Sequence, residues 1–240
     1  MEPSASKSVV MITGAAGGLG AVLVAAFAVA GWQVVAGWHR KLVPLDCSAE
    51  GIHPIRLDVT DPESVTNGFL AMRDRFGHLD ALINAAGVTA DGSIVNLGVI
   101  DWDSVIEVNL RGAARCCQSA LQFFPGDAGG HIVNVGSLAG KIGRSGQANY
   151  AAAKAGLIGF SKAMAREMGS RSIRINVVLP GVMATPMTAT LSQEDLGRLR
   201  DENVLRCLND PVEIARFIVF LVGTRTISGQ VFNLDSRISP

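Results

Sequence analysis

The sequence has no excess of charge of either sign and no long apolar run, and these absences argue against several classes of protein. Lysine plus arginine and aspartate plus glutamate both number 21, so the formal net charge at pH 7 is zero. A protein that binds nucleic acid by neutralising phosphates would be expected to carry a basic excess. No stretch approaches the roughly 20 uninterrupted apolar residues of a membrane span. Residues 1–10 also lack the charged-then-apolar pattern of a signal peptide.

Cysteine and histidine are scarce, and their spacing argues against a disulfide framework or a metal site. The four cysteines include no C-x-x-C pair, which is typical of reduced thiols in a cytoplasmic protein. Cys116 and Cys117 lie in a predicted helix, and we expect both to be buried rather than redox-active. Because His53, His78 and His131 are far apart and have no ligand spacing, we predict no catalytic metal.

Hydrophobic residues make up 48% of the 240 residues and charged residues 18%, which favours a substantial core over disorder. Short apolar runs alternate with segments of helical period, a pattern typical of a parallel sheet with helices on both faces. The expected strands are 8–13, 33–37, 55–58, 81–84, 131–135, 173–179 and 231–234, and the expected helices are 21–30, 61–76, 101–124, 148–168 and 210–222. The connection from 39 to 54 contains Pro44, so any helix there is short or broken. We therefore predict an α/β fold, a doubly wound parallel sheet (Rossmann fold), in a single domain over residues 1–240.

A glycine-rich turn follows the first predicted strand. Residues 13–20 read T-G-A-A-G-G-L-G. Glycines at this place permit a tight turn and let the backbone N–H groups of a helix N-terminus approach a pyrophosphate. The spacing is a variant of the dinucleotide-binding fingerprint. Its position after the first strand of an α/β pattern favours a dinucleotide site over a turn without a ligand.

The end of the second predicted strand indicates which dinucleotide is bound. An acidic residue there would accept a hydrogen bond from a free ribose 2′-hydroxyl and repel a 2′-phosphate. The chain instead reads Trp38-His39-Arg40-Lys41, with no carboxylate until Asp46. A basic turn at this place favours NADP over NAD, and the alternative is a solvated basic loop without a ligand.

Tyr150 is the only tyrosine of the chain and lies four residues before Lys154 in a predicted helix. Residues at i and i+4 share one helix face, and a nearby ammonium would lower the pKa of the tyrosine toward neutrality. Such a tyrosine could protonate a ketone oxygen as hydride reaches the ketone carbon. Ser137, at the end of the fifth predicted strand, could hydrogen-bond the same oxygen. A Tyr–Lys pair at this spacing is more often a coincidence of a helix surface, so its combination with Ser137 and the glycine turn carries the prediction.

With these residues the chain resembles the classical short-chain dehydrogenase/reductase family over nearly its whole length. The glycine motif of that family is matched by residues 13–20, its Asn-Asn-Ala-Gly by residues 84–87 with the second Asn replaced, and its Pro-Gly-x-x-x-Thr by residues 180–185. Residues 146–162 look most like 3-oxoacyl-(acyl-carrier-protein) reductases, and acetoacetyl-CoA and polyketide ketoreductases look similar. The catalytic tetrad of the family falls on Asn109, Ser137, Tyr150 and Lys154.

The resemblance implies a role for each of these residues. Tyr150 would be the general acid and Ser137 would orient the carbonyl. Lys154 would bind the nicotinamide ribose and lower the Tyr150 pKa, while Asn109 would hold a water of a proton relay. The implied cofactor contacts are Gly14, Ala15, Ala16, Gly17 and Leu19 for the pyrophosphate, His39 and Arg40 for the 2′-phosphate, Asp58 and Val59 for adenine, Ala85, Ala86 and Gly87 for the adenosine ribose, and Met183 and Thr185 for the carboxamide.

The chain departs from the family pattern at several positions. Many NADP-using members have a basic residue where this chain has Gly17, so NADP preference rests on His39 and Arg40. Of two basic positions that dock the carrier protein in the bacterial reductases, one is matched by Arg171 and the other aligns with Ala128. The usual Pro-x-Gly-Arg reads V-L-R-C at 204–207, and the usual Asp-Gly-Gly reads D-S-R at 235–237. In this family the C-terminal segment lines subunit contacts and lies near the substrate mouth.

The favoured function is NADPH-dependent reduction of a 3-oxoacyl thioester, on acyl carrier protein or coenzyme A, of the fatty-acid or polyketide type. The resemblance implies a homotetramer. The cysteine pattern favours a cytoplasmic protein, and the balanced charge and the lack of a long apolar run argue against nucleic acid and membrane as partners. One alternative is a reductase or dehydrogenase of another small ketone or alcohol, and another is an inactive partner subunit of a related reductase. The polar segment 188–206 is expected to be a mobile cover over the substrate or an ordinary surface helix.

Overall fold

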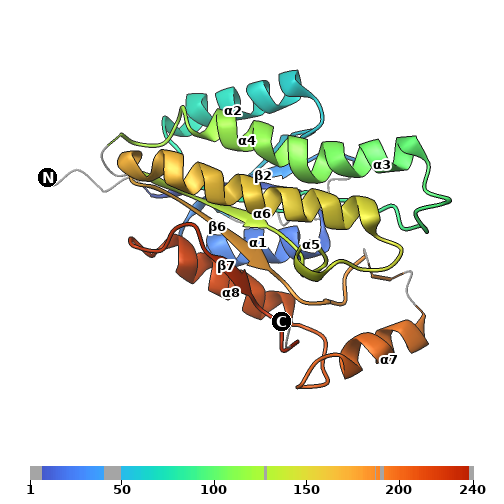
Figure 1. Ribbon diagram of the computed structural model, residues 1–240. Helices are drawn as coiled ribbons and strands as arrows, with labels where there is room; N and C mark the ends of the chain where they lie inside the picture. Colours follow the sequence, from blue (N-terminus) through green and yellow to red (C-terminus); the bar gives the residue numbers. More distant parts are fainter. Residues whose placement is uncertain (1–6, 41–49, 127–128, 187, 190–191, 238–240) are drawn as a thin grey trace, which may run out of the picture.

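A seven-stranded sheet, all of whose strands are parallel, forms the centre of the molecule (Figure 1). This computed structural model describes residues 7–40, 50–126, 129–186, 188–189 and 192–237. The strands are β1 (Val9–Thr13), β2 (Gln33–Trp38), β3 (Ile52–Arg56), β4 (Ala81–Asn84), β5 (Gly130–Val135), β6 (Ile173–Leu179) and β7 (Val231–Asn233). Their order is β3-β2-β1-β4-β5-β6-β7, so the chain winds outward from β1 in both directions and confirms the predicted doubly wound fold.

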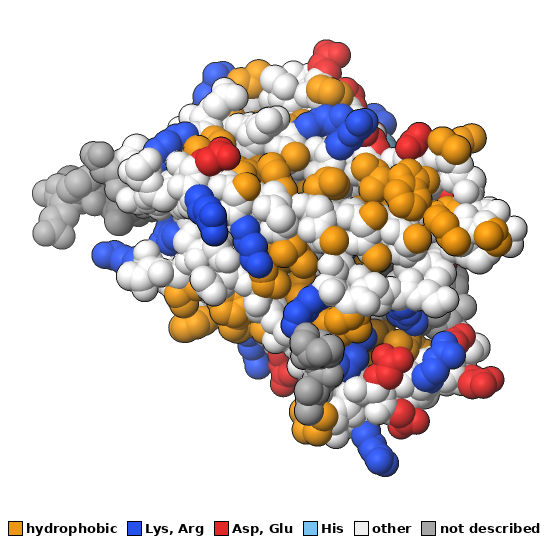
Figure 2. Space-filling model, in the orientation of Figure 1, with side chains coloured by type: hydrophobic (Ala, Val, Ile, Leu, Met, Phe, Trp, Pro, Cys, Tyr) orange, Lys and Arg blue, Asp and Glu red, His pale blue; other side chains and the backbone are white. Residues whose placement is uncertain are grey.

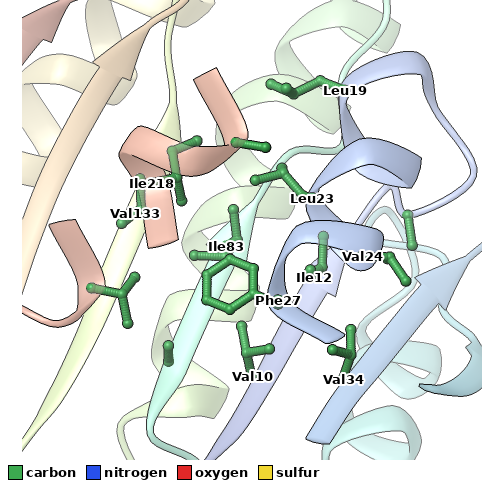
Figure 3. Close-up of a cluster of buried hydrophobic side chains, with 14 of the residues drawn as sticks. Val10, Ile12, Leu19, Leu23, Val24, Phe27, Val34, Ile83, Val133 and Ile218 are labelled. Carbon is green, nitrogen blue, oxygen red and sulfur yellow. The ribbon is translucent and has the colours of Figure 1, made fainter. Parts of the chain in front are cut away.

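Helices cover both faces of this sheet (Figure 1). On one face, α1 (Gly18–Val29) and α8 (Pro211–Val222) pack against alternate residues of the strands. Figure 3 shows this core, in which Phe27 of α1 lies beside Val10 of β1 and Ile83 of β4, and Ile218 of α8 lies beside Val133 of β5. On the other face lie α2 (Pro62–Phe76), α4 (Ala113–Ala120) and α6 (Ala148–Met168). Because both faces are covered, β1 is buried at every residue.

Two helix starts follow the expected capping chemistry. The side chain of Asp61 accepts a hydrogen bond from the backbone N–H of Glu63 at 3.0 Å, and Pro62 occupies the first turn of α2. Asp210 caps α8 in the same way, accepting from Val212 N–H at 2.8 Å. Among the residues that the structure describes, no helix is long and apolar enough to cross a membrane.

The third strand lies earlier in the chain than the sequence predicts. The expected strand 55–58 is in fact β3 at Ile52–Arg56, so Asp58 follows the strand instead of belonging to it. Gly51, with a φ of +90°, turns the chain into β3. Pro54 is tolerated because β3 is an edge strand. Much of the connection from 39 to 54, including Pro44, lies outside the described residues.

The long helix predicted over 101–124 is three consecutive segments. They are α3 (Val99–Ile106), a π-helical turn, η1 (Glu107–Gly112), and α4, which ends at Ala120. Composition does not distinguish a π-helical turn from an α-helix, which is why the sequence did not reveal it. The helix expected from residue 21 begins at Gly18, and the polar segment 188–206 contains α7 (Gln193–Asp201). Two short elements were not expected, α5 (Ala139–Ile142) and a 3₁₀ turn, η2 (Gly169–Arg171).

Candidate active site

A cavity of about 660 Å³ opens where the strands present their carboxyl ends. This is the edge of a doubly wound sheet at which ligands bind. Its lining comes from the turn after β1, the end of β2, the segments after β3, β4, β5 and β6, and the first turns of α6. The predicted site residues that line it are Gly14, Gly17, Leu19, His39, Arg40, Asp58, Val59, Ala85, Ala86, Gly87, Ser137, Tyr150, Lys154, Met183 and Thr185. Ala15, Ala16 and Asn109 are not part of its lining.

The glycine turn is shaped by close backbone approach. Gly14 has a φ of +66°, and a Cβ there would lie 2.6 Å from the Cα of Ala86 in the segment after β4. A Cβ on Gly18 would lie 2.6 Å from the Cβ of Thr185, in the segment after β6. The bare backbone at the start of α1 therefore borders the cavity without side chains. This arrangement fits the pyrophosphate of a dinucleotide, which such a helix N-terminus attracts.

His39 and Asp58 face each other at the outer end of the cavity. Nε2 of His39 lies 3.1 Å from Oδ2 of Asp58. Partial burial raises the pKa of Asp58, but hydrogen bonds from Thr60 and the nearby His39 and Arg40 outweigh it, and the net pKa lies below its usual value. Asp58 therefore remains a carboxylate at neutral pH and can fix the orientation of the His39 ring.

Tyr150, Ser137 and Lys154 come together at the inner end of the cavity. Helix α6 begins at Ala148 and places Tyr150 in its first turn and Lys154 one turn later. Ser137, which follows β5, hydrogen-bonds the hydroxyl of Tyr150. Nζ of Lys154 donates to the carbonyl oxygen of Val135 at 2.8 Å and lies 5.6 Å from the centre of the Tyr150 ring.

The electrostatics of this group bear on the expectation that Lys154 lowers the Tyr150 pKa. Burial raises the pKa of Tyr150; the hydrogen bond from Ser137 opposes the rise, and the charge of Asp91 adds to it. Burial also lowers the pKa of Lys154 to about 8, and its side chain is only 4% exposed. Burial dominates the pKa of both groups, and the lysine nitrogen is directed to the Val135 carbonyl, so the lowering of the Tyr150 pKa by Lys154 stays a prediction.

Asn109 lies in the π-helical turn and acts on the cavity wall rather than on its interior. Its Nδ2 donates to the carbonyl oxygens of Val88 and Val105, both at 2.9 Å, and its Oδ1 accepts from Val88 N–H at 3.3 Å. The amide thus pins the segment after β4, where Gly87 and Val88 line the cavity. The structure supports a positioning role for this side chain.

Several polar residues of the cavity were not predicted as site residues, among them Asp91, Arg144 and Gln147. Asp91, in the segment after β4, accepts a hydrogen bond from Gln147 Nε2 at 2.9 Å, and Arg144 lies in the loop between α5 and α6. Asn149 adds a second link between these loops by donating to the Ala90 carbonyl at 3.0 Å. Asp91 follows a predicted strand by seven residues, and the carboxyl-end rule could have drawn attention to it. No group of three or more His, Cys, Asp or Glu side chains that could hold a metal occurs within the described ranges.

A parallel sheet, a glycine turn that opens its first helix and a tyrosine–lysine pair at the carboxyl ends of its strands together define a dinucleotide-binding oxidoreductase. The sequence profile of the family described as short chain dehydrogenase matches residues 8–196, and the chain belongs to that family, which uses a nicotinamide cofactor.

Several curated relatives are similar over nearly their whole length. The chain is 38% identical over 238 residues to the 3-oxoacyl-(acyl-carrier-protein) reductase FabG of Thermotoga maritima, covering 96% of this chain and 97% of that one. It is 34% identical over 235 residues to the enzyme of the same name from Escherichia coli K12, with 95% of each chain covered. It is also 34% identical over 240 residues to the 3-oxoacyl-(acyl-carrier-protein) reductase of Synechocystis, with 96% of each covered.

Proposed function

We propose that this protein reduces a 3-oxoacyl thioester, carried on acyl carrier protein or coenzyme A, to the 3-hydroxyacyl thioester with NADPH, in a pathway of the fatty-acid or polyketide type. The observation that carries the proposal is the joint placement of Tyr150, Ser137 and Lys154 at the inner end of the cavity. The printed activity of the relatives, 3-oxoacyl-(acyl-carrier-protein) reduction, supports the substrate class.

In this proposal the residues of the protein supply one proton to the ketone oxygen and orient that oxygen. When bound, NADPH supplies the hydride that the ketone carbon accepts. The phenol of Tyr150 donates its proton to the ketone oxygen, and the hydroxyl of Ser137 orients that oxygen by hydrogen bonding. The phenol of Tyr150 is the protonated form at neutral pH, which is the form that can donate a proton. Lys154, held by the Val135 carbonyl 5.6 Å from the centre of the Tyr150 ring, would bind the nicotinamide ribose.

The cofactor residues divide along the cavity from its outer to its inner end. His39 and Arg40 would receive the 2′-phosphate, and Asp58 with Val59 would flank the adenine. The backbone of residues 14–19 would hold the pyrophosphate, residues 85–87 the adenosine ribose, and Met183 with Thr185 the carboxamide. Because no carboxylate is described directly after β2, while His39 and Arg40 follow it, we favour NADPH over NADH.

We also propose that residues 1–240 act as one nucleotide-binding domain, as a cytoplasmic homotetramer whose substrate site lies in the C-terminal half. Arg171 is the candidate contact for the acyl carrier protein. It is exposed and donates to the Leu121 carbonyl at 2.8 Å, which holds its side chain at the surface. Ala128, which aligns with the second basic position that docks the carrier protein in the resembled reductases, lies outside the described residues.

The test measures loss of NADPH absorbance, with NADH in parallel, when the purified protein meets acetoacetyl-CoA or an acetoacetyl carrier-protein thioester. Rapid NADPH oxidation with the carrier thioester is expected. Activity on a free ketone with none on either thioester would indicate a reductase of another small ketone. Binding of NADPH without any turnover would indicate an inactive partner subunit.

A further inference from the structure

The chain that returns from α7 makes a strained turn at a position where the resembled family has glycine. Arg206 has a φ of +49°, one of two positive values among the non-glycine residues described. A residue with a Cβ disfavours this conformation because the Cβ approaches the following carbonyl oxygen too closely. Such a conformation is retained only where contacts with the rest of the protein stabilise it. The contacts of residues 203–206 therefore show what holds this turn in place.

The C-terminal segment supplies those contacts. Ser236 Oγ accepts from the N–H of Leu205 at 3.2 Å and donates to Oδ1 of Asn203 at 3.2 Å, while its carbonyl accepts from the N–H of Val204 at 3.3 Å. Asn203 is itself 2% exposed and donates to the Leu199 carbonyl of α7 at 2.8 Å. One serine thus hydrogen-bonds three consecutive residues of the turn.

Arg237 adds a charged contact to the same turn. Its guanidinium contacts the carboxylate of Asp235, whose side chain is fully buried, and lies 3.8 Å from Glu202 at the end of α7. The resembled family has Gly-Gly at positions 236–237, which would offer none of these side-chain contacts. The two departures noted in the sequence, at 204–207 and at 235–237, therefore touch each other in space.

The turn is joined to the wall of the cavity. Asn209, three residues after Arg206, donates its backbone N–H to the Val182 carbonyl at 2.8 Å and its side-chain amide to the Leu234 carbonyl at 2.6 Å. Val182 and Met183 line the cavity. In contrast, α7 buries only Leu199, and Figure 2 shows charged side chains of both signs over it at the lower right. The segment that contains α7 is therefore connected to the rest of the protein more by the Asn203–Arg206 turn and the C-terminal segment than by α7 itself.

We propose that Ser236 and Arg237 form a latch that positions the Asn203–Arg206 turn and, through Asn209, the Val182–Met183 wall of the cavity, at the end where the nicotinamide and the thioester would meet. Both are positioning residues for the reaction proposed above, on which this inference rests. The latch holds the turn in a conformation that Arg206 by itself disfavours. A well-positioned wall needs no ordering when the substrate binds, so the latch acts on substrate affinity more than on turnover.

The test compares the wild type with Ser236→Gly/Arg237→Gly, with KM and kcat measured for acetoacetyl thioester and NADPH oxidation. We expect the thioester KM to rise about fivefold or more while kcat changes less than about twofold. Loss of folded protein alone would lower the apparent kcat and leave KM unchanged. The control, Arg198→Ala, removes a surface pair with Asp195 on α7 and leaves every latch contact in place, so its KM should match the wild type.

A second readout does not depend on activity. Trypsin can cleave at Arg198, Arg200 and Arg206, and we expect the latch variant to be cut in this segment about fivefold faster or more at a temperature where both proteins are folded. If the double variant fails to fold, Ser236→Ala, which removes only the hydroxyl, replaces it in both measurements. Wild-type KM together with wild-type proteolysis would overturn the latch. Faster proteolysis in a protein without activity on any thioester would support the latch and overturn the proposed function.

Discussion

Nε2 of His39 lies 3.1 Å from Oδ2 of Asp58 at the outer end of the cavity. The carboxylate holds the imidazole at the end of β2, next to Arg40, in a place where the glycine turn offers no basic side chain because residue 17 is glycine. The proposed preference for NADPH thus depends on a short basic segment, His39 and Arg40, in which Asp58 orients His39.

Replacing His39 should therefore weaken the choice of NADPH over NADH. His39→Ala is expected to raise the KM for NADPH about tenfold through loss of a charge-assisted hydrogen bond, with little change for NADH. Initial rates with each cofactor measure this ratio. Equal losses with both cofactors would contradict a contact with the 2′-phosphate.

Removing the hydroxyl of Tyr150 should abolish turnover without removing the cofactor site. Tyr150→Phe keeps the ring and loses the proton donor, so we expect kcat to fall by roughly a thousandfold or more. NADPH binding, followed by fluorescence titration, should stay within about twofold of the wild type, because the substitution leaves the residues proposed to contact the pyrophosphate and the 2′-phosphate unchanged. Retention of most of the activity would show that another group supplies the proton.

A methyl group on Gly18 should block the cavity. Its Cβ would lie 2.6 Å from the Cβ of Thr185 and 3.1 Å from Pro186, so Gly18→Ala is expected to reduce NADPH affinity about tenfold or more. The matched control is Gly159→Ala on α6, where a Cβ meets nothing within 4 Å. This control should keep NADPH affinity and gain about 0.5–1 kcal/mol of stability from helix propensity. Equal NADPH affinity of the two variants would contradict the steric argument.

Stability should fall on acidification because of one buried histidine far from the cavity. His131 is fully buried, and burial, aided by Arg174 and opposed by a hydrogen bond to the Val222 carbonyl, lowers its pKa from 6.5 to about 4. Its Nε2 lies 2.9 Å from the Asn176 amide. Since the unfolded chain binds this proton more tightly, the free energy of unfolding should decrease as pH falls from 6.5 toward 4, by up to about 3 kcal/mol for this group.

Chemical denaturation at pH 7, 6 and 5 measures that slope. In His131→Asn the loss of stability between pH 7 and 5 should be smaller than in the wild type, whatever the absolute stability of the variant. An identical pH dependence in both proteins would exclude His131 as the group responsible.

The sequence revealed those parts of the fold that depend on local pattern. Val- and Ile-rich runs identified the strands, and Asp61 and Asp210 marked two helix starts. Ser137, Tyr150 and Lys154 could be proposed as one site because each stands at a position that a parallel sheet brings to one edge. The third strand was misplaced because Pro54 reads as a breaker unless the strand is known to lie at the edge.

Features that depend on tertiary contacts could not be predicted in this way. The direction of the Lys154 side chain is set by the Val135 carbonyl, and the link between Asp91 and Gln147 joins loops 56 residues apart. The contact between Ser236 and the Asn203–Arg206 turn bridges about thirty residues, and only the folded chain shows that two unusual motifs meet.

The π-helical turn at Glu107–Gly112 sets the number of residues between the part of the helix that contacts the active-site wall and the part that packs into the core. On its active-site side Asn109 must reach Val88, and on its core side Cys116 and Cys117 are fully buried. Each residue of an α-helix advances its face by about 100°, so deletion of one residue from the turn would rotate α4 by that angle relative to α3. Segment 99–120 therefore works as a spacer of set length. Substitutions on its outer face should be tolerated. An insertion or deletion would instead turn either Asn109 away from the active-site wall or Cys116 and Cys117 away from the core.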